Sequence, residues 1–273
     1  MKVAFLGPEG TYTHQAVLQQ FGSKIEISPQ QSIGECFNCI NSKKVDYAVV
    51  PFENSTNGQV VFTYDLLRDW FLNQKCDFKV VGEQFVSIHH NLLGNGPIEE
   101  IKTIYSHPQV WTQVTKFLKS VPNVTKIDVC STSKAAELVS LADSSSAAIS
   151  SIMSSQLYNL PIIQQNIEDN ENNTTRFLIL GYEIPEPQNT QKITSIMLTL
   201  PHDDPGALCD VLVKFKENQI NLTSINSRPS NLKQWQYVFF VEVMGELTNE
   251  LKVEFENSCL NFIVLGEFYR TTV

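Results

Sequence analysis

Five short segments of this chain place hydroxyl, amide, carboxylate and imidazole side chains next to apolar runs. They are residues 7–14, 51–58, 106–111, 130–133 and 172–177. In open α/β sheets, ligands bind at the carboxyl ends of the strands, where turns of this kind lie. Together, the segments predict a site for a small polar molecule.

Two of these segments lead into helical patterns and could bind an anion. Two glycines and a proline precede Thr11, Tyr12 and Thr13, and a second run of hydroxyl side chains includes Thr132. The N-terminus of a helix offers free N–H groups and the positive end of the helix dipole. Helix capping alone is the simpler interpretation of each segment taken singly.

Two further segments supply acidic, amide, hydroxyl and imidazole groups. Their polar side chains are Glu53, Asn54, Ser55, Ser106, His107 and Gln109. An Asx-type turn explains the first three without a ligand, and a capping box between Ser106 and Gln109 explains two more. His107 is then left over, although a lone histidine here is more often a surface residue.

The last segment places Arg176 between Thr175 and the apolar Phe177. An arginine guanidinium is a planar, permanently charged fork that suits a carboxylate. This pattern predicts a carboxylate clamp, with an ordinary surface arginine as the alternative.

Short apolar runs alternate with helical patterns over the first 180 residues. Strands are expected at 3–6, 25–28, 47–50, 79–81, 103–105, 127–129, 147–149 and 177–180. One helical face, after a capping box of Ser32 and Glu35, is formed by Ile33, Cys36, Phe37 and Ile40. The alternation predicts an α/β fold with largely parallel sheets.

The pattern changes after residues 183–189, a proline-containing stretch that is expected to be a linker. Strands are expected at 193–200, 220–227, 237–243 and 262–268, and helices at 205–216 and 248–257. This βαββαβ order predicts a ferredoxin-like layout. Two domains are therefore expected, at residues 1–182 and 193–273.

The bulk properties of the 273 residues exclude several classes of protein. The net charge is −9, so neither nucleic acid nor an anionic membrane is expected as a partner. The sequence shows no membrane span and no signal peptide, which favours the cytoplasm and reduced cysteines. The lone pair Cys36 and Cys39 lacks two further zinc ligands, so no metal is expected.

In chain order, these segments resemble the motifs of the prephenate dehydratase family, most closely its fungal members. Residues 7–13, 51–55, 106–109 and 174–177 resemble its catalytic motifs, and 204–208 and 227–229 resemble those of its ACT domain. The resemblance implies a catalytic domain of two α/β lobes, similar to type II periplasmic binding proteins, with the active site in the cleft. A ferredoxin-like ACT domain would follow at the C-terminus.

The resemblance also implies the site residues. Thr175 would be the critical catalytic residue, in a Thr-Arg-Phe motif with Arg176 and Phe177. The substrate-binding residues would be Thr11, Tyr12, Thr13, Glu53, Asn54, Ser55, Ser106, His107, Gln109 and Thr132.

Paired ACT domains would bind L-phenylalanine as a feedback effector, which implies a homodimer or homotetramer. The effector residues would be Asp204, Gly206, Ala207, Leu208, Asn226, Ser227, Arg228 and Pro229. Asn226 stands where the family has a glutamate, a departure that bears on the strength of phenylalanine binding.

The implied reaction converts prephenate into phenylpyruvate, CO₂ and water, and needs no cofactor because aromatisation drives it. A threonine hydroxyl is too weak an acid to act alone near neutral pH, so Thr175 is expected to donate a fixed hydrogen bond to the departing oxygen. Arg176 is expected to hold the carboxylate of the pyruvyl side chain. The ring carboxylate, whose charge disappears, is expected near Phe177, and Glu53 or His107 could carry the proton.

Other interpretations stay open at this point. The same reaction on arogenate, which carries an amine, is compatible with the sequence. A two-lobed protein that only binds or senses amino acids is a second alternative. Nothing before the first motif resembles a chorismate mutase helix, so a monofunctional enzyme is expected.

Overall fold

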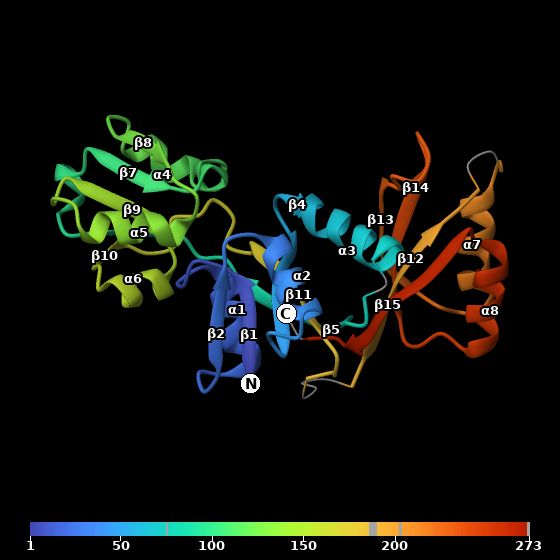
Figure 1. Cartoon of the computed structure of the whole chain (residues 1–273). Helices are drawn as coiled ribbons and strands as arrows, with labels where there is room; N and C mark the ends of the chain where they lie inside the picture. The colour runs from blue at the N-terminus through green and yellow to red at the C-terminus, as the bar shows by residue number, and fades with distance from the viewer. Residues whose placement is uncertain (75, 186–189, 202–203, 272–273) are drawn as a thin grey trace.

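The computed structural model describes residues 1–74, 76–185, 190–201 and 204–271. Figure 1 shows a row of three units, with a green lobe at the left, a blue lobe in the middle and an orange-red unit at the right. Of the predicted linker, residues 186–189 lie outside the described parts. Within those parts, no helix is long and apolar enough to cross a membrane.

The middle lobe is built on a mixed six-stranded sheet of order β2-β1-β3-β11-β5, with β4 paired to β3. Its strands are β1 (Lys2–Leu6), β2 (Glu26–Gln30), β3 (Tyr47–Asn54), β4 (Gly58–Gln59), β5 (Lys79–Ser87) and β11 (Thr174–Gly181). Its helices are α1 (Tyr12–Phe21), α2 (Ile33–Asn41) and α3 (Val61–Asn73).

The prediction of largely parallel sheets is right for only part of this lobe. β1, β2 and β3 are parallel, whereas β11 runs antiparallel to both β3 and β5. The reason is that β11 enters the sheet from the other lobe and does not follow a crossover helix of its own lobe.

The left-hand lobe has a five-stranded sheet of order β10-β6-β9-β7-β8. Its strands are β6 (Asn91–Gly94), β7 (Thr103–Ser106), β8 (Thr125–Asp128), β9 (Ser146–Ser150) and β10 (Ile162–Gln164). Its helices are η1 (Ile98–Glu100), η2 (Pro108–Thr112), α4 (Thr115–Ser120), α5 (Thr132–Ser140) and α6 (Ile152–Tyr158). β4, β6 and β10 were not predicted.

The chain crosses between the two lobes twice, and the crossings lie side by side. The amide of Ile88 donates to the carbonyl of Asn173 (2.8 Å), and the amide of Ile167 donates to the carbonyl of His90 (2.8 Å). This arrangement confirms the prediction of two α/β lobes, joined by a narrow hinge.

The right-hand unit has the predicted βαββαβ order and an antiparallel sheet of order β13-β14-β12-β15. Its elements are β12 (Lys192–Thr199), α7 (Ala207–Glu217), β13 (Leu222–Pro229), β14 (Tyr237–Met244), α8 (Asn249–Ser258) and β15 (Asn261–Tyr269). Phe215 of α7 and Phe255 of α8 are fully buried against one face of the sheet.

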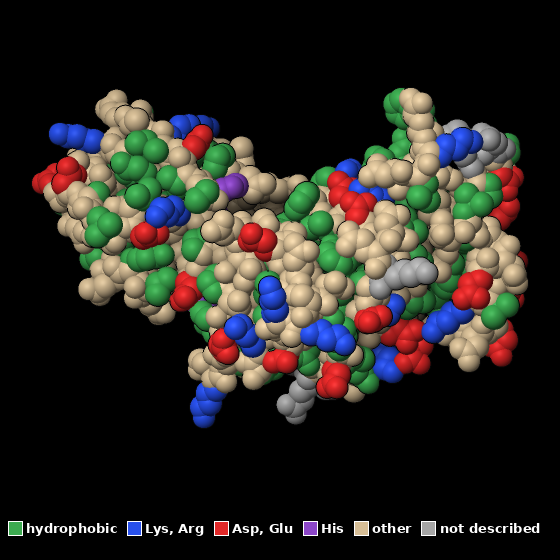
Figure 2. Space-filling model, in the orientation of Figure 1, with side chains coloured by type: hydrophobic (Ala, Val, Ile, Leu, Met, Phe, Trp, Pro, Cys, Tyr) green, Lys and Arg blue, Asp and Glu red, His purple; other side chains and the backbone are tan. Residues whose placement is uncertain are grey.

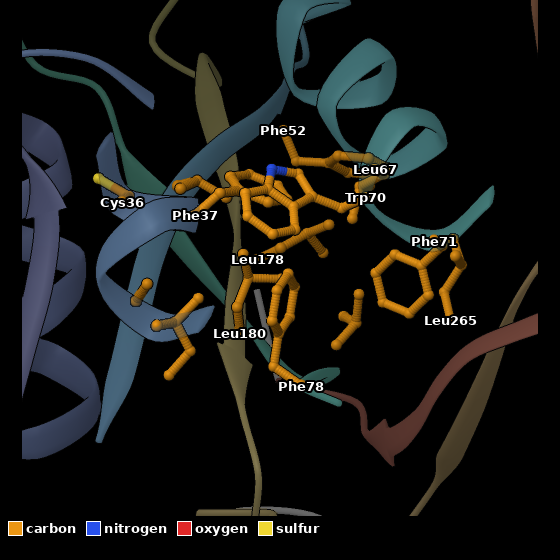
Figure 3. Close-up of a cluster of buried hydrophobic side chains, with 14 of the residues drawn as sticks. Cys36, Phe37, Phe52, Leu67, Trp70, Phe71, Phe78, Leu178, Leu180 and Leu265 are labelled. Atoms are coloured by element: carbon orange, nitrogen blue, oxygen red, sulfur yellow. The ribbon is translucent and has the colours of Figure 1, made fainter. Parts of the chain in front are cut away.

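The opposite face of this sheet is buried against the middle lobe. Met197, Phe240, Leu265 and Phe268 belong to one hydrophobic cluster with residues of α2, α3, β3, β5 and β11, and Figure 3 shows Leu265 beside Phe71. A Cβ on Gly266 of β15 would lie only 1.8 Å from the carbonyl oxygen of Val80, so the two backbones nearly touch. The two units therefore share a continuous core and are not joined by a linker alone.

Candidate active site

A cleft of about 1290 Å³ lies between the two lobes. The middle lobe lines it with the ends of β1 and β3 and the first residues of α1 and α3. The left-hand lobe lines it with residues 107–113, the start of α5 and the end of α6. In Figure 2 the molecular surface dips between the left-hand lobe and the centre of the molecule. The cleft thus lies at the strand ends where the sequence predicts a site.

The structure brings all five chemistry-bearing segments to this cleft. The predicted residues that line it are Thr11, Tyr12, Thr13, Asn54, His107, Gln109, Thr132, Thr175 and Phe177. Four predicted residues are not among the lining residues: Glu53, Ser55, Ser106 and Arg176.

The hydroxyl of Thr175 is oriented by Asn54, its partner on the neighbouring strand. Asn54 Nδ2 donates to Thr175 Oγ1 at 2.9 Å. The amide cannot be flipped without loss, because Asn54 Oδ1 accepts from the backbone amides of Thr56 (3.0 Å) and Asn57 (2.8 Å). Since Thr175 Oγ1 accepts this bond, its own proton is free to donate into the cleft.

The same hydrogen bonds continue across the hinge. Asn54 Nδ2 also donates to Asn173 Oδ1 (2.8 Å), and Asn173 Nδ2 donates to Gln113 Oε1 (3.1 Å). His90 Nε2 lies 2.6 Å from the same Gln113 oxygen, so this nitrogen carries the proton. The hydroxyl of Tyr12 lies 3.2 Å from the other ring nitrogen of His90, Nδ1, and donates to the carbonyl of His89 (2.8 Å). Both crossing segments thus support the position of Thr175.

Sequence reasoning missed the hinge residues His90, Gln113 and Asn173. The available signal was the polar run His89, His90 and Asn91 directly after a strand. Their mutual contacts join segments that are far apart in the chain, and no local pattern reports such contacts.

His107 caps the short helix η2, a role the sequence interpretation gave to Ser106. His107 Nδ1 accepts from the amide of Gln109 (3.3 Å), whereas the fully buried Ser106 donates to the carbonyl of Ile149 (2.8 Å). The predicted capping box is therefore wrong. Burial lowers the pKa of His107, opposed by Asp128, and burial likewise lowers the pKa of His90. Both rings are neutral near pH 7.

Arg176 faces away from the cleft because successive strand side chains point to opposite faces. Its Nε donates to Glu83 Oε2 (2.7 Å), and its two terminal nitrogens donate to both oxygens of Glu242 (2.7 and 2.9 Å). Burial opposes the charge, but the two carboxylates outweigh it and raise the pKa of Arg176. The expected grip of Arg176 on a substrate carboxylate does not fit this position.

Positive charge reaches the cleft by other routes. α1 and α5 both begin at the cleft, with Thr11 and Ser131 as N-caps that accept from amides three residues on (3.3 and 3.0 Å). Of the described residues that line the cleft, Lys134 is the one Lys or Arg, with Nζ 2.9 Å from Glu137 Oε1. Among the described residues, no His, Cys, Asp and Glu side chains gather into a metal site.

The predicted effector residues lie in the turn before α7 (Asp204, Gly206), at the start of α7 (Ala207, Leu208) and on β13 (Asn226–Pro229). Asn226 Nδ2 donates to the hydroxyl of Tyr64 (2.9 Å), and Asn226 Oδ1 accepts from Gln59, a residue that lines the cleft. Arg228 forms a bidentate pair with Asp65 of α3 (2.9 and 2.9 Å). Within this chain, the β13 motif therefore contacts the middle lobe.

Comparisons with known proteins agree with this architecture. Residues 3–185 match the family model for prephenate dehydratase, and residues 194–254 match the model for the ACT domain. A probable prephenate dehydratase of Saccharomyces cerevisiae is 40% identical over 90% of this chain and 88% of its own length. The prephenate dehydratase of Methanocaldococcus jannaschii is 38% identical over 97% of each chain.

Solved structures give the same picture. The prephenate dehydratase of Arthrobacter aurescens in complex with L-Phe has a TM-score of 0.88 at 26% identity, and the match covers 99% of this chain and 90% of that one. The Staphylococcus aureus prephenate dehydratase has a TM-score of 0.81 at 27% identity, over 98% of this chain and 100% of that one.

Proposed function

The chain belongs to the prephenate dehydratase family, and we propose that Thr175 is the group that helps the ring hydroxyl of prephenate to leave. In this reaction the bond to the ring carboxylate breaks, its electron pair enters the ring, and the hydroxyl departs with one added proton as water. The products are phenylpyruvate and CO₂. The observation that carries the role of Thr175 is the bond from Asn54, which leaves the Thr175 proton free for the departing oxygen.

The size of the Thr175 effect follows from its chemistry. A fixed donor that faces developing negative charge contributes about 3 kcal/mol, or roughly a hundredfold in rate. The donor costs no reorganisation, because Asn54 is itself held by two backbone amides and by Asn173. A hydroxyl held in this way stabilises the transition state more than the bound substrate.

The two carboxylates of prephenate need different surroundings. For the pyruvyl carboxylate, we propose the N-terminus of α5 together with Lys134, in place of Arg176. The ring carboxylate loses its charge as CO₂ forms, so strong donors would stabilise the ground state. We therefore propose that it lies against Ile88 and Phe177, apolar residues of the cleft wall near Thr175.

The proton for the leaving hydroxyl has one remaining candidate carrier of the two expected. Glu53 is not among the lining residues, whereas His107 is. Because His107 Nδ1 accepts the amide of Gln109, the neutral ring carries its proton on Nε2 and can donate a hydrogen bond from there; transfer of a proton requires the imidazolium form, because a neutral imidazole is far too weak an acid.

The ACT domain supports feedback regulation by L-phenylalanine, which the Arthrobacter aurescens relative binds. Asp204, Gly206–Leu208 and Asn226–Pro229 remain the proposed effector residues, with a homodimer or homotetramer as the proposed assembly. A cytoplasmic location also stays a prediction of the sequence.

The deciding experiment is an assay of the purified protein, without added cofactor, on prephenate and separately on arogenate. Formation of phenylpyruvate from prephenate supports the proposal. If the protein forms phenylalanine from arogenate but no phenylpyruvate from prephenate, the substrate is arogenate. Thr175→Ala should lose at least about a hundredfold in kcat. The matched control is Thr125→Ala, which removes an exposed hydroxyl from β8 in the other lobe. Equal activity of the two variants would refute the role of Thr175.

A further inference from the structure

Arg176 follows Thr175 directly in the chain, and its side chain links β11 to the ACT domain. Its guanidinium lies between Glu83 of β5 and Glu242 of β14, and its carbon centre lies 5.2 Å from the ring centre of Phe52. The exposed fractions of the Arg176, Glu83 and Glu242 side chains are 11%, 0% and 7%. Of the three strands involved, β5 and β11 belong to the catalytic domain and β14 to the ACT domain.

The three side chains form a buried network that would be costly to break, and Arg270 Nε lies 4.0 Å from Glu83 Oε1 at its edge. Glu242 accepts two parallel N–H bonds, the geometry in which an arginine–carboxylate pair is most directional. Glu83 also accepts the amide of Thr271, in the chain that follows β15 (3.2 Å). When one partner of a buried ion pair is lost, the remaining charge stays uncompensated, so the network resists displacement.

This network acts on β11 where the backbone pairing is irregular. The register between β11 and β3 shifts between Arg176 and Phe177, so the ladder to β3 is interrupted directly after Arg176, whereas the pairing of β11 with β5 stays regular from Thr174 to Ile179. On the β3 side, where the ladder is interrupted, the anchored side chain of Arg176 adds a fixed point that helps to place the backbone. A displacement of β14 would pass through Glu242 to Arg176, and from there to the Thr175 hydroxyl.

We infer that Glu242 is a positioning residue for the reaction: through Arg176 it fixes the Thr175 end of β11 and makes the cleft sensitive to the state of the ACT domain. The inference rests on the proposed function, because it needs Thr175 to act on the substrate. It assigns Arg176 and Glu242 no contact with the substrate. Coupling of this kind requires a physical element that both sites bias, and the Arg176 network is such an element.

The test is a double-mutant cycle between Glu242 and Thr175. In Glu242→Gln, an amide N–H group faces an arginine N–H group, so the bidentate pair is lost with little change in volume. We expect kcat on prephenate to fall about tenfold, with KM nearly unchanged. In a Thr175→Ala background, the same change should have almost no effect on kcat, because no hydroxyl is left to misplace. Inhibition by L-phenylalanine should also weaken in Glu242→Gln, whereas Glu242→Asp, which keeps the charge, should recover part of both losses.

Asp65→Asn serves as the control, because Asp65 also bridges the two domains but pairs with Arg228 and Arg68, away from β11. Its kcat without phenylalanine should match that of the unmodified protein. Thermal unfolding of each variant separates misplacement from loss of the fold. If Glu242→Gln lowers kcat by the same factor with Thr175 and with Thr175→Ala, Glu242 is merely structural and the inference is wrong. If the unmodified protein produces no phenylpyruvate, the proposed function fails first.

Discussion

The two faces of β11 divide the work between uncharged and charged groups. On the cleft face, the amide of Asn54 holds Thr175, and Asn173 in turn holds Asn54, all through neutral hydrogen bonds. On the opposite face, Arg176 lies between two buried carboxylates. Directed neutral donors suit a reaction that removes a negative charge from its substrate. Fixed charges are better suited to hold the strands and domains in place.

The largest effect should come from a charge introduced on the neutral face. In Asn54→Asp, a carboxylate would replace the amide that donates to Thr175 Oγ1. The threonine hydroxyl would then donate to this carboxylate and no longer to the departing oxygen. We expect kcat to fall by about a hundredfold or more, because the donor is lost and a negative charge is added beside an anionic substrate.

Steady-state kinetics on prephenate would check this, with Asn57→Asp as the control. Asn57 also lines the cleft, but only its backbone amide contacts Asn54. Similar losses in the two variants would mean that charge in the cleft matters more than the orientation of the Thr175 hydroxyl.

The position of Arg176 shows which part of the site could be predicted from sequence. If Thr175 and Phe177 face the cleft, Arg176 must face away from it, because side chains alternate along a strand. The motif resemblance outweighed this rule in the sequence interpretation. What the rule could not supply was the identity of the partners, because Glu83 and Glu242 come from strands distant in the chain.

The sequence also indicates in part that both faces of the ACT-domain sheet are buried. Residues 193–200 contain apolar side chains at positions that face both ways, which is typical of a strand buried on both faces. In the structure, Ile193 and Met197 pack towards the middle lobe, and Ile196 and Leu198 pack towards α7 and α8. The sequence could not show which lobe would be covered, because that depends on shape complementarity between distant segments.

A second, smaller effect should come from the charged group of the cleft. Lys134→Gln removes the one lysine or arginine among the described lining residues. Because the pyruvyl carboxylate keeps its charge throughout the reaction, Lys134 should bind substrate and transition state alike. We expect KM to rise about tenfold with kcat nearly unchanged. Lys119→Gln, on α4 of the same lobe, makes the same charge change at an exposed position outside the cleft lining.

A drop in kcat with constant KM in Lys134→Gln would contradict the idea that neutral groups act in the chemical step and charged groups only in binding or in holding the structure. It would mean that a cation acts in the chemical step and not only in binding. A rise in KM for Lys119→Gln of the same size would instead mean that the general field of the lobe attracts the substrate, with no specific carboxylate site at the start of α5.

The smallest effect concerns the stability of the hinge in acid. Burial lowers the pKa of His90 from its ordinary value of 6.5. The unfolded chain therefore binds a proton at this residue at a higher pH than the folded protein does. The stability that a neutral His90 gives is fully present above about pH 6.5 and declines as the pH falls below it, by at most about 1.4 kcal/mol per pH unit for one histidine.

Urea unfolding between pH 7.5 and 5.5, compared for the unmodified protein and His90→Gln, would measure this contribution. Other groups, such as the buried Glu83, cancel in the comparison. The unmodified protein should lose more stability over this range than the variant, because only its hinge contains the neutral imidazole that donates to Gln113. Parallel pH profiles would show that His90 accepts a proton without disturbing the chain of hydrogen bonds to Thr175. A positive charge on His90 would then be tolerated at the end of the hydrogen-bond chain away from Thr175. The requirement for neutral groups would apply only to the residues next to Thr175.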